Sequence, residues 1–219
     1  LAVVAPTLIA VFTFFNMLRG DTPQSWDTWL MSGSAIWAFF MLPMSVTALT
    51  ALVAHMEHGP KSWDHLRALP LPRWRLYAAK AVCVVAVVAL MSVLTLALTW
   101  AAAEAAGVVK PAVAPSGGAD FAKHAWLLAK ILAAATLLIA VQLWMALRFS
   151  SFVPGLALGI GGTFFAVVAT SARAGVFMPW QMPVNILIEE SGRAETALML
   201  GGAGGLVVLA LMIAHLSRR

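Results

Sequence analysis

The sequence predicts an all-α protein that crosses a membrane as a bundle of about six helices. Of its 219 residues, 62% are hydrophobic and only 11% are charged. Soluble domains carry about 25% charged residues, so this apolar excess is too large for a soluble core and requires lipid as its solvent. Six long apolar segments alternate with polar stretches, and tryptophans gather near the segment ends, as they do at membrane–water interfaces.

Each apolar segment is long enough for a helix that crosses about 30 Å of hydrocarbon. Helices are required because unpaired backbone groups are not tolerated in lipid. The six segments are Leu1–Leu18, Trp29–Ala54, Ala78–Ala103, Trp126–Leu147, Phe152–Ser171 and Ala197–Leu216. The fifth is the least regular, since it contains Pro154 and several glycines. The segments leave no room for a separate soluble domain, so residues 1–219 are expected to form one transmembrane domain.

Basic residues predict the orientation, because cytoplasmic loops carry an excess of lysine and arginine. One side would hold eight of them, Lys61, Arg67, Arg73, Arg75, Lys80, Arg148, Arg218 and Arg219. The other side would hold five, Arg19, Lys110, Lys123, Arg173 and Arg193. The first set is therefore expected on the cytoplasmic side of the membrane, together with both chain termini.

The chain begins at Leu1, directly inside the first apolar segment. A secretory signal peptide starts with a basic region and ends at small residues, and residues 1–19 have neither feature. We therefore expect the true N-terminus to lie upstream of Leu1.

The loop between the second and third segments, residues 56–76, carries the most local information. Its prolines favour a short helix over Lys61–Leu69, of about two and a half turns. Trp63, Leu66 and Leu69 would share one face of that helix. A helix this short is marginal by itself in water, so lipid, the protein's own helix ends or a partner protein must cover the apolar face.

The elements around this loop resemble the ABC-2 type permeases. An acidic residue ends the second segment, a short loop helix follows, and Leu-Pro-x-x-Arg and a lysine lead into the third segment. These elements are Glu57, Lys61–Leu69, Leu71-Pro72-Arg73-Trp74-Arg75 and Lys80. The stretch Phe177-Met178-Pro179-Trp180-Gln181-Met182-Pro183, before the last segment, is similar as well. The nearest branch is the small six-span permeases of bacitracin and lantibiotic self-protection exporters.

The resemblance implies a type V exporter-like transmembrane domain that moves a hydrophobic or peptide substrate. In that family the loop helix is the coupling element that docks on a separate ATPase subunit, and two permease subunits pair around the translocation path. ATP and magnesium would bind the partner ATPase, with no cofactor or metal in this chain. The implied coupling residues are Glu57, Lys61, Trp63, Leu66, Arg67, Leu69 and Arg73.

The sequence lacks the patterns of an ATPase and of a nucleic-acid-binding protein. No Gly-x-x-x-x-Gly-Lys-Ser/Thr stretch is present, so the energy for transport must come from a partner. The basic residues lie among lipid-spanning runs, which argues against binding of nucleic acid. The chain is therefore predicted to be a transporter subunit rather than an enzyme.

Patterns for membrane enzymes are incomplete. His55, His58 and His65 do not have the His-Glu-x-x-His order of zinc hydrolases. The run Glu189–Arg193 is one residue short of the motif of CAAX-type intramembrane proteases. An integral membrane enzyme, or a membrane assembly factor with six spans, remains the alternative function.

A few polar and small residues inside the segments suggest helix contacts. Glu104 and Lys130 lie near the external ends of adjacent segments, where they either pair or reach the interface separately. Asn16 and Gln142 could line a path or bond to neighbouring helices. Glycines spaced four apart let helices approach closely, within the chain or at a seam between two permease subunits. The two pairs are Gly155 with Gly159 and Gly201 with Gly205.

Overall fold

The computed structural model of the chain describes residues 2–58, 72–149, 151–168, 173–188 and 192–218. These residues form helices, with no β-strand among them, which confirms the all-α prediction. The longer helices are α1 (Val4–Arg19), α2 (Trp26–Ile36), α3 (Leu42–His58), α5 (Arg73–Val109), α6 (Phe121–Ala134), α7 (Thr136–Arg148), α8 (Val153–Val168) and α11 (Gly205–Ser217). Short helical elements are η1 (Trp37–Met41), η2 (Pro111–Val113), η3 (Arg173–Phe177), α9 (Met182–Asn185), α10 (Arg193–Ala197) and η4 (Leu198–Gly204).

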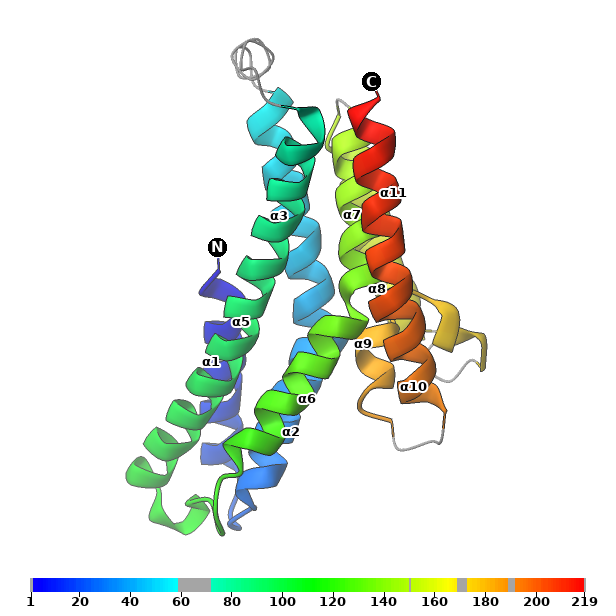
Figure 1. Ribbon diagram of the computed structural model, residues 1–219. Helices are drawn as coiled ribbons and strands as arrows, with labels where there is room; N and C mark the ends of the chain where they lie inside the picture. Colours follow the sequence, from blue (N-terminus) through cyan, green and yellow to red (C-terminus); the bar gives the residue numbers. More distant parts are fainter. Residues whose placement is uncertain (1, 59–71, 150, 169–172, 189–191, 219) are drawn as a thin grey trace.

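The helices form two groups, and α5 runs from one end of the bundle to the other (Figure 1). At one end α1, α2 and α6 pack around the C-terminal half of α5. Towards the other end α3, α7, α8 and α11 pack together. The C-terminal ends of α3, α7 and α11 and the start of α5 lie at this second end, which we call the loop end (Figure 1). The basic residues Arg73, Arg75, Arg148 and Arg218 are therefore grouped at one end of the bundle, as the sequence predicted.

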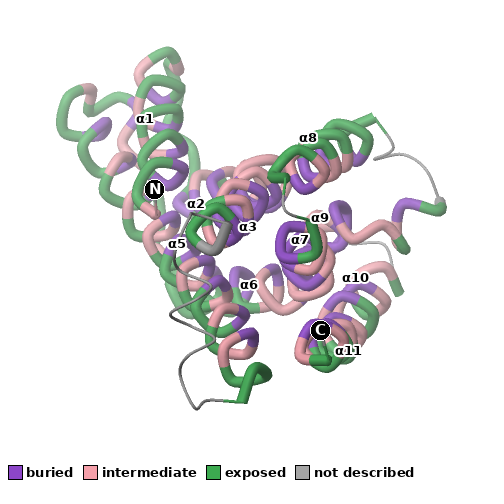
Figure 2. Tube along the Cα trace, turned by 90° about the horizontal axis from the view of Figure 1, so that it is seen from above, coloured by how far each residue is buried: buried purple, intermediate pink, exposed green. Residues whose placement is uncertain are grey.

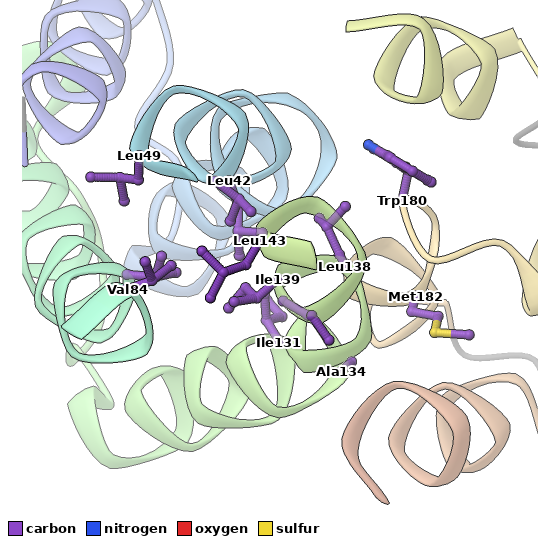
Figure 3. Close-up of a cluster of buried hydrophobic side chains, with 14 of the residues drawn as sticks. Leu42, Leu49, Val84, Ile131, Ala134, Leu138, Ile139, Leu143, Trp180 and Met182 are labelled. Carbon is purple, nitrogen blue, oxygen red and sulfur yellow. The ribbon is translucent and has the colours of Figure 1, made fainter. Parts of the chain in front are cut away.

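The main apolar core lies where α3, α5, α6 and α7 meet (Figure 3). Leu42, Leu138, Ile139 and Leu143 are fully buried there, and Val84 is 2% exposed. Seen from above, the buried positions of each helix face its neighbours and the exposed positions face outward (Figure 2). A second, smaller cluster joins α1, α2 and α5 at the opposite end; its buried members are Met17, Trp26, Leu30, Ala103, Ala106 and Val113.

Hydroxyl groups are buried inside the bundle while large apolar side chains cover its outside. The buried hydroxyl residues are Thr13, Ser34, Ser45, Thr47, Thr50, Ser92, Thr95, Thr99 and Thr163. Several donate to the carbonyl four residues earlier, as Ser34 does to Leu30 and Thr95 to Met91, both at 2.9 Å. The exposed large residues include Phe12, Phe15, Phe164, Phe165, Leu206 and Leu211. A surface of this kind is suited to lipid, because soluble proteins rarely expose so large an apolar surface to water.

Among the described residues, fewer helices are long enough to cross a membrane than the six that the sequence predicts. Within the described residues, three continuous helical stretches pass by length and composition: Trp26–Met56, Arg73–Val109 and Arg193–Ser217. A fourth is possible if α6 and α7, which meet at a bend of 42°, form one span. Within the described residues, α1 and α8 are shorter apolar helices of 16 residues each, about 24 Å long. Because α1 lies at the start of the sequence and α8 ends where the described residues end, the spans predicted for the first and fifth segments stay a prediction.

A π-helical turn, η1, separates α2 from α3 at a position that the sequence explains. Pro43 follows it, and a proline inside a helix lacks an N–H and clashes with the carbonyl four residues earlier, here Phe39 within η1. Widening the turn removes this conflict, and the N–H of Leu42 bonds to the Trp37 carbonyl five residues earlier. The indole Nε1 of Trp37 donates to Ser92 Oγ on α5 at 3.1 Å, which ties the widened turn to the continuous helix.

A second irregular region forms where the bend between α6 and α7 meets the π-helical turn η4. Gly201 and Gly205 lie so close to the backbone of Ala134 and Thr136 that a Cβ atom at either glycine would overlap it. The bend and both glycines are buried. A Cβ atom at Gly155 would instead lie at an ordinary contact distance, 3.6 Å, from Ala146. Gly201 and Gly205 therefore serve packing within the chain.

This contact predicts different effects for two neighbouring glycines. Gly201→Ala would place a methyl group on the Ala134 carbonyl oxygen, and we expect overpacking to destabilise the protein by about 1–3 kcal/mol. Gly202→Ala is the matched control, because its methyl group would lie 3.7 Å from the nearest atom and helix propensity favours alanine. Thermal unfolding in detergent measures both. Equal melting temperatures for the two variants would contradict the close contact.

Candidate functional site

The predicted coupling loop connects α3 to α5 at the loop end (Figure 1). Glu57 lies in the last turn of α3, which ends at His58, and α5 begins at Arg73, which is exposed. The other predicted coupling residues lie outside the described residues; they are Lys61, Trp63, Leu66, Arg67 and Leu69. Their role stays a prediction. What the structure describes is the pair of helices that flanks them.

The first turns of α5 combine basic side chains with aromatic rings. The guanidinium carbon of Arg75 lies 5.6 Å from the centre of the Trp74 ring, and Lys80 Nζ lies 5.8 Å from the centre of the Tyr77 ring. The Trp74 side chain is about half exposed, whereas Tyr77 is buried. Cation–π contacts and basic side chains that lie along apolar surface are typical of a helix at the membrane–water interface. This part of α5 is therefore suited to the level of the lipid headgroups.

The length of α5 gives the loop a direct connection to the rest of the bundle. The helix has 37 residues without a break, a length of about 55 Å. A bilayer with its headgroups is about 40–45 Å thick, so α5 must tilt or project beyond it. It contacts α1, α2, α3, α6, α7 and α11 along its course. A displacement at its first residues can therefore reach these six helices through direct contacts.

A buried polar junction joins α3, α7 and α8; its members are Thr47, Gln142, Gly155 and Gly159. Gln142 Nε2 donates to Thr47 Oγ1 at 2.9 Å and to the Gly155 carbonyl oxygen at 3.4 Å. Thr47 Oγ1 in turn donates to the Pro43 carbonyl oxygen at 2.9 Å. Gln142 is fully buried and Thr47 is 2% exposed. Polar side chains in an apolar surrounding hold helices together, because separating them would leave these groups unpaired.

Gly159 makes room for this polar junction. A Cβ atom at Gly159 would overlap both Gln142 Nε2 and Thr47 Oγ1. The remaining amide oxygen of Gln142, Oε1, is buried and has no hydrogen-bond partner among the described residues. Of the two amides whose role the sequence left open, Gln142 bonds to neighbouring helices, whereas Asn16 is exposed on α1.

The second motif of the resemblance folds back against α8. The Trp180 ring packs on Gly162, where a Cβ atom would overlap it. Gln181 Nε2 donates to the Ala166 carbonyl oxygen at 2.7 Å, near the C-terminal end of α8. Trp180 and Gln181 are 6% and 4% exposed. The segment that the sequence placed in an external loop therefore contributes to the packed interior.

At the end opposite the loop end, Lys110 ties α1 to α5. Its Nζ donates to the carbonyl oxygens of Leu18 at 3.3 Å and Gly20 at 2.7 Å, and pairs with the Asp21 carboxylate at 3.1 Å. The last carbonyls of a helix are free of intrahelical partners and carry partial negative charge, so a cation there is stabilising. The sequence predicts Lys110 only as a loop cation, because no local pattern relates residues about 90 positions apart in the chain.

Asp27, in the first turn of α2, receives two basic partners from the start of α6. Its Oδ1 atom pairs with Lys123 Nζ and lies 3.1 Å from Nε2 of His124. His124 is fully buried, whereas the Asp27 side chain is about half exposed. These contacts, together with Lys110, fasten the ends of α1, α2, α5 and α6 to one another. No local pattern in the sequence predicts these contacts either, since Asp27 and Lys123 are 96 positions apart in the chain.

The remaining predicted polar residues lie apart from these networks. Glu104 is exposed on α5 and Lys130 is half-buried on α6, and neither forms an ion pair within the described residues. Pairing between them therefore stays a prediction. Of the histidines, His55 is exposed and His215 accepts a hydrogen bond from Trp144 Nε1 at its Nδ1 atom, at 3.1 Å.

One comparison with known proteins identifies the family. A family model described as ABC-2 family transporter protein matches residues 1–168, well over half of the chain. The chain belongs to the ABC-2 transporter family. No curated protein and no solved structure matches it. The resemblance found in the sequence is thereby confirmed for the family, while the bacitracin and lantibiotic branch stays a prediction.

Membership of the ABC-2 family explains the apolar outer surface of the bundle and the polar junction inside it. The matched region runs from α1 through α8 and includes the predicted coupling loop. Proteins of this family are membrane components of transporters, so the apolar outer surface of the bundle is a membrane-facing surface. The polar junction then lies among helices of a transport protein, where a hydrogen-bonded contact that joins three helices holds one arrangement of them.

The polar junction predicts a measurable coupling between Gln142 and Thr47. We expect Gln142→Leu and Thr47→Val each to lower stability in detergent, with a coupling energy of about 0.5–1.5 kcal/mol in the double variant. Thr50→Val is the control, because its hydroxyl bonds only to carbonyls of its own helix. Strict additivity of Gln142→Leu with Thr47→Val would show that the junction contributes no coupling.

Proposed function

We propose that the chain is the permease subunit of an ATP-binding-cassette exporter, driven by a separate ATPase subunit that docks on residues 56–76. Family membership carries the transporter part of this proposal. The sequence has no ATP-binding Gly-x-x-x-x-Gly-Lys-Ser/Thr stretch, so the ATP and magnesium would belong to the partner. The protein would lie in a bacterial inner membrane with the loop end and both termini in the cytoplasm.

The charges at the two ends of the bundle support this orientation. Arg73, Arg75 and Arg148 lie at the loop end, and all three are exposed. Cytoplasmic loops are rich in such residues. At the opposite end, Lys110 pairs with Asp21 and Lys123 pairs with Asp27, whereas Arg19 forms no ion pair among the described residues. Carboxylates thus offset two of the cations there, which favours the loop end as the cytoplasmic side.

The proposed mechanism transmits movement of the ATPases through α3 and α5. Closure of two ATPase subunits on ATP would displace the loop helices of two permease subunits. The unbroken α5 would carry the displacement towards the opposite end. The π-helical turn η1 and the bend between α6 and α7 interrupt the other long helices, and such irregular turns are points where a helix changes direction at low cost. The helices interrupted at these two places could then alternate between two arrangements, one open to each side of the membrane.

The proposed substrate is a hydrophobic or peptide compound, of which antimicrobial peptides of the bacitracin and lantibiotic type are the first to test. The support is the resemblance in the loop and in the segment that contains Trp180. Such substrates dissolve in lipid or at its surface, and an exporter of this kind would take them from the membrane. The polar lining would come from the buried hydroxyls of α3 and α5.

Co-purification with an ATPase tests the coupling loop. The chain would be expressed with a candidate ABC ATPase subunit and purified in detergent beside a Trp63→Ala/Leu66→Ala variant. Apolar anchors at the centre of an interface are each worth about 2 kcal/mol, so we expect the variant to bind the ATPase at least about 30-fold more weakly. Trp126→Ala is the matched control, since this tryptophan is 66% exposed on α6, far from the loop end.

Two outcomes would contradict the proposal. If the unchanged chain and the Trp63→Ala/Leu66→Ala variant retain the ATPase equally, the loop is not part of the docking surface. If no ABC ATPase is retained and no ATP hydrolysis accompanies the chain, the exporter function itself fails, and a membrane enzyme or assembly factor becomes the better explanation.

A further inference from the structure

The outer face of α1 carries a groove that the proposed function does not use. It has a volume of about 330 Å³ and follows one side of the helix; its lining residues are Leu8, Val11, Phe12, Phe15, Asn16 and Arg19. The opposite side of α1 packs on α5 through residues such as Ile9, Thr13 and Met17. Figure 2 shows α1 at the edge of the bundle, and all six lining residues are exposed.

The polarity of this groove changes along its length. From Leu8 to Phe15 its walls are apolar, with Leu8, Phe12 and Phe15 each more than half exposed. Asn16 and Arg19 then form a polar end. Eleven residues of helix separate Leu8 from Arg19, about 16 Å, which is half of a hydrocarbon core about 30 Å thick. The α1 groove therefore has about the length of one leaflet, and its polar end is suited to the level of the headgroups.

The polar end of the groove favours an anion. Arg19 is exposed and forms no ion pair among the described residues. The neighbouring cation, Lys110, is already matched by Asp21. The carbonyl oxygens of Leu18 and Gly20, at the end of α1, are occupied by Lys110 as well. The Arg19 guanidinium is thus left as an uncompensated positive charge beside an amide that donates and accepts hydrogen bonds.

We propose that the α1 groove binds one anionic phospholipid, with its phosphate at Arg19 and Asn16 and an acyl chain along Leu8, Val11 and Phe12. A guanidinium matches phosphate oxygens in a two-pronged geometry, and the apolar walls match the acyl chain. A zwitterionic lipid is disfavoured because its own cation would lie near Arg19. The groove is therefore expected to prefer anionic headgroups to zwitterionic ones.

A second copy of the chain is a poorer occupant of the same groove. Subunits related by a two-fold axis along the membrane normal place identical residues at the same depth. A symmetric contact through α1 would bring the two Arg19 side chains towards each other, and like charges that face each other destabilise an interface. An anionic headgroup turns the same arginine into a favourable contact.

Lipid titration of the detergent-purified chain, followed by native mass spectrometry, tests this proposal. The probes are phosphatidylglycerol and phosphatidylcholine with identical acyl chains. One basic residue near a charged headgroup is worth about fivefold in affinity, so we expect about a fivefold preference for phosphatidylglycerol. Arg19→Gln should abolish the preference. Arg148→Gln, which removes an exposed arginine at the loop end, should leave it unchanged.

A second variant separates the groove from the charge. Val11→Trp fills the middle of the groove without altering Arg19, and we expect it to reduce retention of both lipids. Absence of any headgroup preference, an Arg19→Gln variant that binds as the unchanged protein does, or full retention by Val11→Trp would each overturn the proposal. So would efficient disulfide cross-linking of Val11→Cys between two copies in membranes that contain phosphatidylglycerol, because the groove would then be occupied by protein.

Discussion

The structure depends on one constraint, that every backbone polar group at the depth of the hydrocarbon must find its partner inside the protein. Three places break the regular helical ladder: the π-helical turn η1, the bend between α6 and α7, and the π-helical turn η4. All three are covered by other helices. Trp37 and Ala135 are fully buried, and Gly201 packs directly on the backbone of Ala134. A change that uncovers one of these breaks would expose unpaired backbone groups to lipid. The fold therefore requires close packing at all three places.

The same constraint explains how polar side chains are distributed. Several hydroxyls in the bundle return their hydrogen bonds to their own helices, and the buried Gln142 bonds to α3 and α8. The ion pairs of Lys110 and Lys123 lie at the end opposite the loop end. Between these ends α5 is the continuous element, and the helices that cross from one group to the other are the interrupted ones. A transporter needs both properties, a rigid connection to its energy source and helices that can repack.

Much of this organisation could be predicted from the sequence, because composition and hydropathy act over short distances. The all-α class, the apolar segments and the grouping of the basic residues followed from those patterns, and the ABC-2 resemblance rested on a few residues around Glu57 and Pro72. The widened turn before Pro43 had a local signal that was overlooked. The ion pairs of Lys110 and Asp27, and the bond between Gln142 and Thr47, had none, since they join residues about 90 positions apart. The described residues contain three or four helices that could cross a membrane by length and composition, and hydropathy marks where a segment is apolar, not where its helix ends.

The most direct test of the central claim is the accessibility of the coupling loop from the two sides of the membrane. A Ser62→Cys variant in a Cys83→Ser background would be treated with a membrane-impermeant thiol reagent, beside a Gly118→Cys variant at the opposite, exposed end. We expect position 62 to react only when the cytoplasmic face is accessible, to be protected when the ATPase subunit is bound, and position 118 to react only from the other side. Reaction of position 62 from the external face, or its indifference to the ATPase, would contradict the assignment of this loop as the connection to an energy source.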